Sequence, residues 1–529
     1  MATTQIPLNL GTLPAFRNET YADFTSPDSR RSMRQALDAV RAQSGREYEL
    51  WLAGARLKTE EKLVSRNPSR PSEIVGVHQK ATPAMAGMAV ESAFSYFPEW
   101  SRTNAQDRVR MLLGAAGILR ARKLEFDAWL VREAGKTWIE AEADVCEAID
   151  FCDYYARECV RICGPDEKRV TPIAGEKNEL RYIPLGVGLV IPPWNFPLAI
   201  TTGMATAAIV SGNTVVLKPS SDSPAIAYQM FEILQEAGVP AGVLNFCPGS
   251  GGSVGDLMVT HPKVRFIAFT GSKEVGLRIN ELAAKPQKGQ IWIKRVVAEM
   301  GGKDGIIVDS DTDLDKAAEA VAVSAFGYQG QKCSACSRAI VVDAVYNQFL
   351  EKLKARVEKI KVGPSDDPGN YMGPVINAGS MKSILEYIEI GTKDGKLLTG
   401  GGRAAEGGYF VQPTVIYDVP PTGRISQEEI FGPVLAISRA KDFEQALEFA
   451  NNTEFGLTGA VFTNSREKLE KAREVFHVGN LYLNRKCTGA FVGGHPFGGF
   501  NMSGTDSKAG GPDYLLLFTQ AKSISEKVS

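Results

Sequence analysis

VGLVIPPWNFPLAITTGMATAAIVSGNTVVL, residues 187–217, carries the clearest secondary-structure signal in the chain. It opens with a β-branched run, Val187 to Ile191, continues through an apolar helical stretch near Leu198 to Val210, and returns to a second run, Val215 to Leu217. A strand, a helix and a strand in this order are typical of a parallel sheet with right-handed crossovers. We therefore expect an α/β fold.

The same alternation continues toward the C-terminus. Further short β-branched runs lie at Val243 to Phe246, Phe266 to Phe269, Val296 to Ala298 and Ile306 to Val308. A second series follows Phe326, with helices expected at Val345 to Ile360 and Met381 to Asp394 and a strand at Val434 to Ser438. Two series of this kind predict two α/β domains.

The N-terminal part of the chain combines helical and strand-like sequence patterns. A helix is expected from Arg31 to Gln43, and Leu50 to Arg56 together with the turn Asn67-Pro68 indicates a hairpin-like edge. From Gln106 to Arg161 apolar residues recur with a helical period, and Gly135 offers a break between helices.

The tail from Tyr514 to Ile524 resembles a strand without a partner, since Leu515 to Phe518 are all apolar. Exposed apolar edges are usually covered in native proteins. We therefore expect a homo-oligomer.

Composition favours a folded protein that acts on a small molecule. The 529 residues are 44% apolar and 23% charged, with a net charge of -1, so no basic footprint for nucleic acid or an anionic membrane is present. The uncharged stretch from Tyr182 to Leu217 is broken by prolines, which argues against a membrane span. Eight cysteines without a small-domain framework and no secretory signal predict free thiols in the cytoplasm.

One candidate nucleophile lies in the segment Gly330 to Cys336. It places the Cys333 thiol in a short polar loop beside Lys332, where a thiolate would be favoured. Two alternatives remain open here: an inert buried cysteine, and a thioredoxin-like redox pair with Cys336. Zinc is disfavoured, because the chain has four histidines and no second cysteine pair with ligand spacing. We expect no metal.

A candidate base and two glycine-rich turns lie in the first α/β series. Glu299 ends an apolar strand, where partial burial would raise its pKa toward that of a useful base, although a solvated loop glutamate is the alternative. Gly249 to Gly255 nearly fits the dinucleotide fingerprint, and Phe269 to Gly276 opens a helix whose N-terminus could hold a phosphate. Neither turn on its own is a specific signal of a dinucleotide site.

Taken in order, six segments resemble the motifs of the aldehyde dehydrogenase superfamily: Ile191 to Pro197, Leu217 to Ser220, Phe269 to Ser272, Glu299 to Gly302, Gly330 to Cys333 and Glu428 to Val434. The resemblance spans about residues 60 to 520. It implies a Rossmann-like cofactor domain (1–161 and 183–300), a catalytic α/β domain (301–504) and a small β oligomerisation flap (162–182 and 505–529).

The resemblance also implies a mechanism. Cys333 attacks the aldehyde carbonyl, and the Asn195 side-chain amide with the Cys333 backbone N–H holds the oxyanion. Hydride leaves for the nicotinamide, and water activated by Glu299 hydrolyses the resulting thioester.

The implied cofactor is NAD. The family pattern puts Lys218 on the adenosine ribose, Trp194 near the pyrophosphate, Ser272 on a phosphate, and Glu429 with Phe431 on the nicotinamide riboside. Further cofactor positions expected from the motifs are Ser220, Ser221, Gly251, Gly255, Gly271 and Gly301. Many NAD-preferring members have a glutamate shortly after the Lys-Pro dipeptide, whereas this chain has Ser220-Ser221. We therefore expect NAD to be preferred and NADP to be tolerated.

Within the superfamily, three stretches are similar to the 1-pyrroline-5-carboxylate dehydrogenases, also called L-glutamate γ-semialdehyde dehydrogenases: Gly330 to Arg338, Asn484 to Ala490 and His495 to Gly499. Cys487 departs from the serine of some members. The similarity implies that the Ser334 hydroxyl and the amides of Gly489 and Ala490 grip the substrate α-carboxylate. Two rings would flank its aliphatic chain, those of Phe196 and Phe497.

The implied reaction yields L-glutamate in the second oxidative step of proline degradation, with the substrate supplied by a separate proline dehydrogenase. One alternative is an aldehyde dehydrogenase for another acid-bearing semialdehyde, such as succinate semialdehyde. Another is a structural homologue that has lost catalysis.

Overall fold

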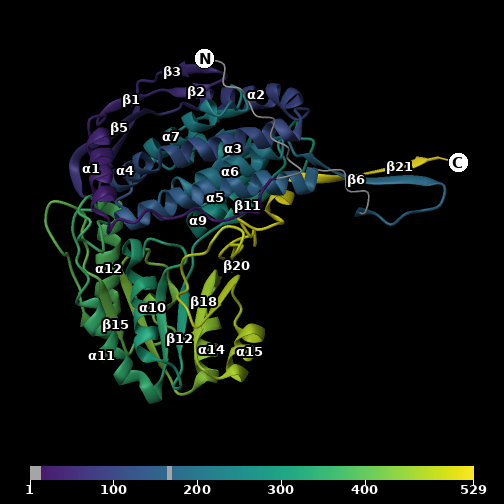
Figure 1. Ribbon diagram of the computed structural model, residues 1–529. Coiled ribbons are helices and arrows are strands. Elements are labelled where there is room, and N and C mark those ends of the chain that lie inside the picture. Colours follow the sequence, from purple (N-terminus) through teal and green to yellow (C-terminus); the bar gives the residue numbers. More distant parts are fainter. Residues whose placement is uncertain (1–12, 164–168, 529) are drawn as a thin grey trace.

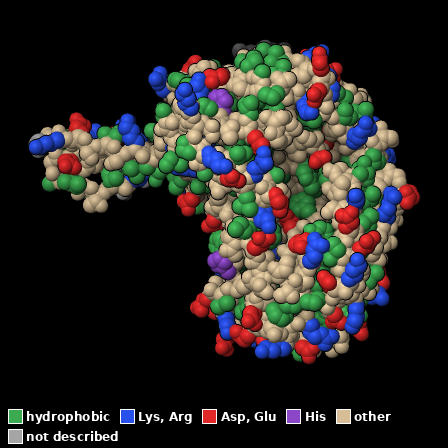
Figure 2. Space-filling view, turned by 180° about the vertical axis from the view of Figure 1, so that it is seen from behind, with side chains coloured by type: hydrophobic (Ala, Val, Ile, Leu, Met, Phe, Trp, Pro, Cys, Tyr) green, Lys and Arg blue, Asp and Glu red, His purple; other side chains and the backbone are tan. Residues whose placement is uncertain are grey.

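Two seven-stranded sheets, each covered by helices, form most of the described structure, with a three-stranded sheet, a short two-stranded sheet and a projecting two-stranded arm beside them (Figure 1). The computed structural model describes residues 13–163 and 169–528. Within that part of the chain, no helix has the length and apolar character needed to cross a bilayer. On the face shown in Figure 2, basic and acidic side chains are interspersed.

The first sheet contains the stretch 187–217 and has the order β11-β10-β7-β8-β9-β2-β3. The five strands that alternate with helices in the sequence pair in parallel, while β2 and β3 add an antiparallel edge. The strand predictions for this sheet are confirmed within a few residues. The bounds are β2 Leu50–Leu52, β3 Ala55–Leu57, β7 Val187–Ile191, β8 Thr214–Leu217, β9 Leu244–Phe246, β10 Val264–Thr270 and β11 Arg295–Glu299.

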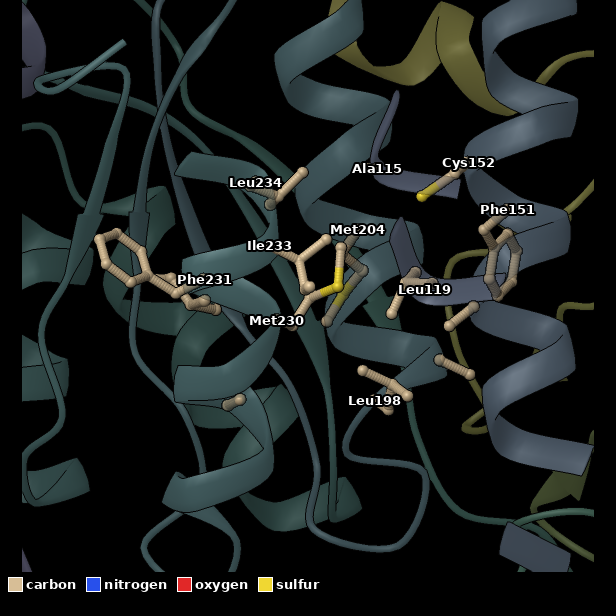
Figure 3. Close-up of a cluster of buried hydrophobic side chains, with 14 of the residues drawn as sticks. Ala115, Leu119, Phe151, Cys152, Leu198, Met204, Met230, Phe231, Ile233 and Leu234 are labelled. Carbon is tan, nitrogen blue, oxygen red and sulfur yellow. The ribbon is translucent and has the colours of Figure 1, made fainter. Parts of the chain in front are cut away.

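Both faces of this sheet are buried. In β7 the side chain of Leu189 packs with one core cluster and that of Val190 with the other, which is the period-2 alternation of a strand covered on both sides. One face carries α2 Pro83–Trp100, α8 Asp256–Thr260 and α9 Lys273–Ala284. The other carries α3 Ala105–Ala121, α4 Lys123–Glu133, α5 Trp138–Cys163, α6 Ala199–Val210 and α7 Pro224–Glu236. Figure 3 shows apolar side chains of α3, α5, α6 and α7 in this core.

The first sheet and the helices on its two faces are here called the first lobe, and the N-terminal elements flank it. The early helix is α1 Pro27–Arg41, which begins four residues before the prediction. The Asn67-Pro68 turn joins β4 Lys62–Asn67 to β5 Arg70–Gln79, which pair antiparallel beside β1 Arg46–Tyr48. Gly135, at φ +64°, separates α4 from α5 as predicted, and a second, unpredicted break at Arg122 separates α3 from α4.

The second sheet has the order β14-β15-β16-β13-β12-β18-β19, and only β14 runs antiparallel to its neighbour. The strand bounds are β12 Asp304–Val308, β13 Cys336–Val342, β14 Lys396–Thr399, β15 Thr414–Tyr417, β16 Val434–Ala440, β18 Thr458–Phe462 and β19 Asn480–Leu483. The helices are α10 Leu314–Phe326, α11 Tyr346–Val357, α12 Ala378–Asp394, α13 Arg424–Gln427, α14 Phe443–Asn451 and α15 Arg466–Val475. The chain passes from the first sheet to the second between β11 and β12.

The arm pairs β6 Glu176–Pro184 with β21 Thr519–Lys527 in antiparallel register and projects from the first lobe (Figure 1). The prediction of a strand from Tyr514 to Ile524 is confirmed from Thr519 onward and is wrong before it, because Tyr514–Phe518 is a 3-10 helix. Its side chains pack into the core of the first lobe, where the Phe518 and Phe266 rings meet at 5.4 Å. The arm is therefore shorter than the predicted flap, of which residues 164–168 and 529 lie outside the described part.

Candidate active site

A strained turn positions the predicted nucleophile. Between α10 and the Cys333 loop, Tyr328 and Gln329 have φ values of 49° and 57°, a left-handed conformation that costs non-glycine residues about 1–3 kcal/mol each. The Gln329 side-chain amide holds this turn: it donates to the carbonyls of Gly135 and Pro374 at 3.2 and 2.8 Å and accepts from the Gly373 N–H at 2.9 Å. The loop that follows therefore starts from a fixed backbone.

The electrostatics of the thiol differ from the expectation. Lys332 lines the same cavity as Cys333 and forms an ion pair of 2.7 Å with Glu140. Burial, followed by the charges of Asp304, Glu429 and Glu299, holds the pKa of Cys333 well above its usual value. Burial and these three carboxylates oppose the thiolate that the prediction expected Lys332 to favour.

Cys336 does not face Cys333 as a redox partner. Its buried thiol donates to the carbonyl of Arg338 at 3.3 Å and neighbours the Cys487 thiol, whose own Sγ donates to the Ser334 carbonyl at 3.4 Å. All eight cysteines are free, as predicted. The geometry argues against the thioredoxin-like alternative.

Glu299 ends β11 as a buried carboxylate. Its Oε1 accepts from the Ser507 hydroxyl at 2.7 Å and the Ser507 N–H at 3.3 Å, while Oε2 accepts from the Gly499 N–H at 3.3 Å. Burial raises its pKa to about 7 even though these hydrogen bonds lower it. The prediction that burial raises this pKa is confirmed, and the solvated-glutamate alternative is wrong. No local sequence pattern indicated Ser507 as its partner.

Two cavities meet at Cys333, whose side chain lines both. The first is bounded by Glu299 and by all the predicted substrate residues: Phe196, Ser334, Gly489, Ala490 and Phe497. The second is bounded by Asn195 and by nine predicted cofactor residues: Trp194, Lys218, Ser220, Ser221, Gly271, Ser272, Gly301, Glu429 and Phe431. A nucleophile between two cavities can contact two ligands at once.

Two predicted cofactor residues lie outside these walls. Gly251 and Gly255 bound a π-helical turn that leads into α8. A Cβ placed on Gly255 would lie 3.5 Å from the Lys218 side chain, so this turn packs behind that lysine. Neither glycine lines the second cavity, and their assignment to the cofactor stays a prediction.

The second cavity combines donors and acceptors suited to a dinucleotide. The buried Lys218 Nζ donates to the Gly249 carbonyl at 3.1 Å, and burial lowers its pKa to about 8. Glu429 accepts from the Gly302 N–H at 2.9 Å, and burial raises its pKa to about 7. Ser272 caps α9, and Ser272 and Val275 at the start of this helix line the cavity, where a helix N-terminus suits a phosphate.

The residues of this wall that the site prediction did not name include Asp222 and, in the first turns of α12, Gly379, Ser380 and Ser383. Asn377 caps α12 by accepting from the Ser380 N–H at 2.8 Å. An asparagine before a helical pattern is the signal that could have indicated this helix start.

The first cavity contains an acidic helix face that the sequence interpretation missed. Glu140, Glu147 and Asp150 of α5 line it at spacings of seven and three residues, which places them on one face of a helix. Lys332 neutralises Glu140, and Asp150 accepts from the Asn18 side chain at 2.8 Å. Glu147 has no hydrogen bond or ion pair within the described residues, and burial raises its pKa to about 8.

Hydrogen bonds with the Arg485 and His495 side chains hold the loop that carries Gly489. Gly489 has φ +77°, and the Arg485 guanidinium donates to the carbonyls of Thr488 and Gly489, each at 3.1 Å. The Phe491 N–H donates to the His495 ring at 3.1 Å. With these carbonyls turned toward Arg485, the loop can present backbone amides to the cavity.

The aldehyde dehydrogenase family model matches residues 56–524. The 1-pyrroline-5-carboxylate dehydrogenase of Geobacillus thermodenitrificans is 55% identical over 511 residues, covering 97% of this chain and 99% of that protein. The enzyme of that name from Bacillus subtilis is 52% identical over 514 residues, with the same coverage.

Solved structures agree with these sequence relatives. A 1-pyrroline-5-carboxylate dehydrogenase from Thermus with bound NAD superposes with a TM-score of 0.95 at 51% identity, over 98% of this chain and 100% of that chain. A proline utilization A (PutA) protein from Bdellovibrio bacteriovorus superposes with a TM-score of 0.95 at 43% identity, over 97% of this chain and 53% of that chain. The protein therefore belongs to the aldehyde dehydrogenase family.

Proposed function

We propose that this protein oxidises L-glutamate γ-semialdehyde, the open form of 1-pyrroline-5-carboxylate, to L-glutamate with NAD⁺. The observation that carries the proposal is the position of Cys333, which lines both the cavity beside Glu299 and the cavity beside Glu429. The names of the relatives support this substrate, and the bound NAD of the Thermus structure supports this cofactor.

The first half of the reaction forms a carbon–sulfur bond between Cys333 and the aldehyde. Because burial raises the pKa of the Cys333 thiol, the attack requires a proton acceptor, and Glu299 on the same cavity wall has a pKa raised to about 7. The Asn195 Nδ2 group donates one N–H to the Gln331 carbonyl at 3.0 Å, which leaves its second N–H for the oxyanion.

The second half releases the acid. When bound, NAD⁺ supplies the acceptor for the hydride that the thiohemiacetal loses, and Cys333 is then a thioester. Glu299 first releases to solvent the proton that it took from the thiol. It then takes a proton from the water that attacks this thioester, and the sulfur leaves as a thiolate. A base with a pKa near 7 suits this role at neutral pH.

Substrate recognition uses two groups at the far end of the first cavity. The amides of Gly489 and Ala490 and the Ser334 hydroxyl hold the α-carboxylate, with the Phe196 and Phe497 rings beside the aliphatic chain. Glu147 accepts the α-ammonium group, because it is the carboxyl of this wall without a partner among the described residues. Succinate semialdehyde lacks an ammonium group and would leave Glu147 unpaired.

The dinucleotide occupies the second cavity, where a lysine, a helix N-terminus and a carboxylate fit the ribose, phosphate and nicotinamide parts of NAD. Ser220 and Ser221 line the wall near Lys218 without a carboxylate of their own, and the neighbouring Asp222 carboxylate accepts from the Asn377 side chain at 3.2 Å, so NADP is tolerated as well. The residues that hold the dinucleotide are Trp194, Lys218, Ser220, Ser221, Gly271, Ser272, Gly301, Glu429 and Phe431.

We place this activity in the cytoplasm, as the second oxidative step of proline degradation, with a separate proline dehydrogenase supplying the substrate. The arm of β6 and β21 is the part through which copies of the chain form a homo-oligomer. The molar masses of the wild-type protein and of a variant without β21, measured by light scattering, test whether this arm joins the copies.

The decisive experiment follows reduced-nicotinamide absorbance with L-1-pyrroline-5-carboxylate and NAD⁺, for the wild type and Cys333→Ser. Turnover that Cys333→Ser abolishes is the expected result. Turnover of succinate semialdehyde alone would keep the mechanism and overturn the substrate. NAD⁺ binding without turnover of either substrate would favour a catalytically silent homologue.

A further inference from the structure

The N-terminal segment Phe16–Ala22, here called the strap, crosses the wall of the first cavity although it lies before the residues that the family model matches. The Tyr21 side chain lines this cavity. The Phe16 ring packs edge-on against Tyr154 of α5 at a centroid distance of 5.1 Å. The Ala22 N–H donates to Glu142 at 2.6 Å. The strap is thus fastened along α5.

One side chain of the strap joins two walls of the cavity. The Asn18 Nδ2 group donates to Asp150 Oδ2 at 2.8 Å and to the carbonyl of Val492 at 3.0 Å. Asp150 belongs to α5, whereas Val492 belongs to the loop that continues from Gly489 and Ala490. A single amide therefore ties the acidic helix face to this loop.

Other contacts position that amide. Asp150 Oδ1 accepts from the Glu19 N–H at 2.7 Å, so both oxygens of this carboxylate hold the strap. A Cβ placed on Gly493 would lie 3.0 Å from the Phe16 ring, so the strap also covers the loop backbone one residue beyond Val492. The loop has no regular secondary structure of its own here, and its distance from α5 depends on contacts of this kind.

We infer that Asn18 is a positioning residue that fixes the loop of residues 489–493 against α5 and thereby sets the affinity for the substrate α-carboxylate. The inference rests on the proposed function, in which the amides of Gly489 and Ala490 hold that carboxylate. A loop that drifts from α5 carries these amides out of place, while the thiol and the dinucleotide cavity stay intact.

The test compares Asn18→Ala with Arg17→Ala, an exposed neighbour in the same strap with no hydrogen bond or ion pair among the described residues. We expect Asn18→Ala to raise KM for L-1-pyrroline-5-carboxylate roughly tenfold, since it loses a hydrogen bond to a charged group and one to a carbonyl. The kcat, the KM for NAD⁺ and the kcat/KM for propanal, which has no carboxylate, should stay within about twofold. Arg17→Ala should match the wild type throughout.

Hydrogen–deuterium exchange tests the loop position without any substrate. Amides of residues 489–493 should exchange faster in Asn18→Ala than in Arg17→Ala. Unchanged exchange, or an equal loss of activity with both aldehydes, would overturn the inference. Faster exchange in a protein that does not turn over L-1-pyrroline-5-carboxylate would leave the loop assignment standing and reject the proposed function.

Discussion

The Ser507 hydroxyl donates to Oε1 of Glu299 at 2.7 Å, which links the segment before β21 to the last residue of β11. Burial raises the pKa of Glu299 to about 7, and the hydrogen bond from Ser507 opposes that shift by stabilising the ionised carboxylate. The basicity of this group is therefore set by residues more than two hundred positions apart in the sequence.

Replacing Ser507 should move the pH dependence of catalysis. A general base is active when ionised, so kcat of the wild type should fall as pH drops through about 7. Ser507→Ala removes a hydrogen bond to the ionised form, which raises the pKa further and shifts this acid limb to higher pH. A pH profile of kcat for both proteins measures the shift. The limb should be absent from the residual activity of Glu299→Gln, and a shift to lower pH in Ser507→Ala would contradict the assignment.

Replacing Glu147 should change substrate preference more than the chemical step. In Glu147→Gln the α-ammonium group loses an ionic hydrogen bond, which is worth about 1.5–3 kcal/mol, or roughly ten- to hundredfold in KM. Succinate semialdehyde has no ammonium group, so its kcat/KM should hold or rise. Steady-state kinetics with both substrates measures the ratio. An equal loss with the two substrates would mean that Glu147 acts on the fold rather than on the ammonium group.

The sequence was sufficient to predict helices and strands whose signal is local. It did not predict the contacts between segments that are distant in the chain. β-branched runs bounded by turns located β7 and β16, because buried parallel strands need that composition whatever their neighbours are. The tail at Tyr514–Phe518 was misassigned, since an apolar run of this length fits a strand and a core-filling 3-10 turn equally well.

In the candidate site too, local sequence patterns located residues, whereas contacts between distant segments were missed. The position of Cys333 came from its motif, but its pKa depends on burial and on Glu299, Glu429 and Asp304, none of which is adjacent in the chain. The adjacent Lys332, which the sequence interpretation credited with activating the thiol, is engaged by Glu140 from α5. Side-chain direction and pairing follow from tertiary packing, which a single sequence does not display.

Adding a carboxylate at Ser221 should exclude NADP. Ser221 lines the cofactor cavity with Lys218, and a glutamate there would repel a 2′-phosphate, whereas it can accept hydrogen bonds from the free ribose hydroxyls of NAD. In Ser221→Glu the kcat/KM for NADP⁺ should fall roughly tenfold or more, with that for NAD⁺ kept within about threefold. Ser221→Gln, of equal size without charge, is the matched control. Equal losses for both cofactors in Ser221→Glu would point to steric obstruction.

Replacing Cys336 should leave dehydrogenase activity intact. Its thiol donates to the Arg338 carbonyl inside the protein, and a serine hydroxyl can make the same contact. Cys336→Ser should retain kcat within about twofold, whereas Cys333→Ser should lose turnover and keep NAD⁺ affinity. Initial rates and dinucleotide titrations separate the two variants. Loss of turnover in a folded Cys336→Ser protein would revive a redox role for the pair.

Removing the charge of Lys136 should destabilise the first lobe. Lys136 and Asp144 form an ion pair at 3.3 Å with both side chains fully buried, and the ammonium group lies 3.7 Å from the centre of the Phe196 ring. Asp144 also accepts from the Ala199 N–H at 2.7 Å at the start of α6.

Lys136→Met leaves the Asp144 carboxylate buried and uncompensated, which should lower the free energy of unfolding by about 3–5 kcal/mol. Lys396→Met breaks an exposed ion pair with Asp418 and should cost less than about 1 kcal/mol. Chemical denaturation of both variants measures the difference. The double variant Lys136→Met/Asp144→Asn should recover part of the loss, because it removes the stranded charge. A Lys136→Met protein as stable as Lys396→Met would show that the buried pair contributes nothing to the stability of this lobe.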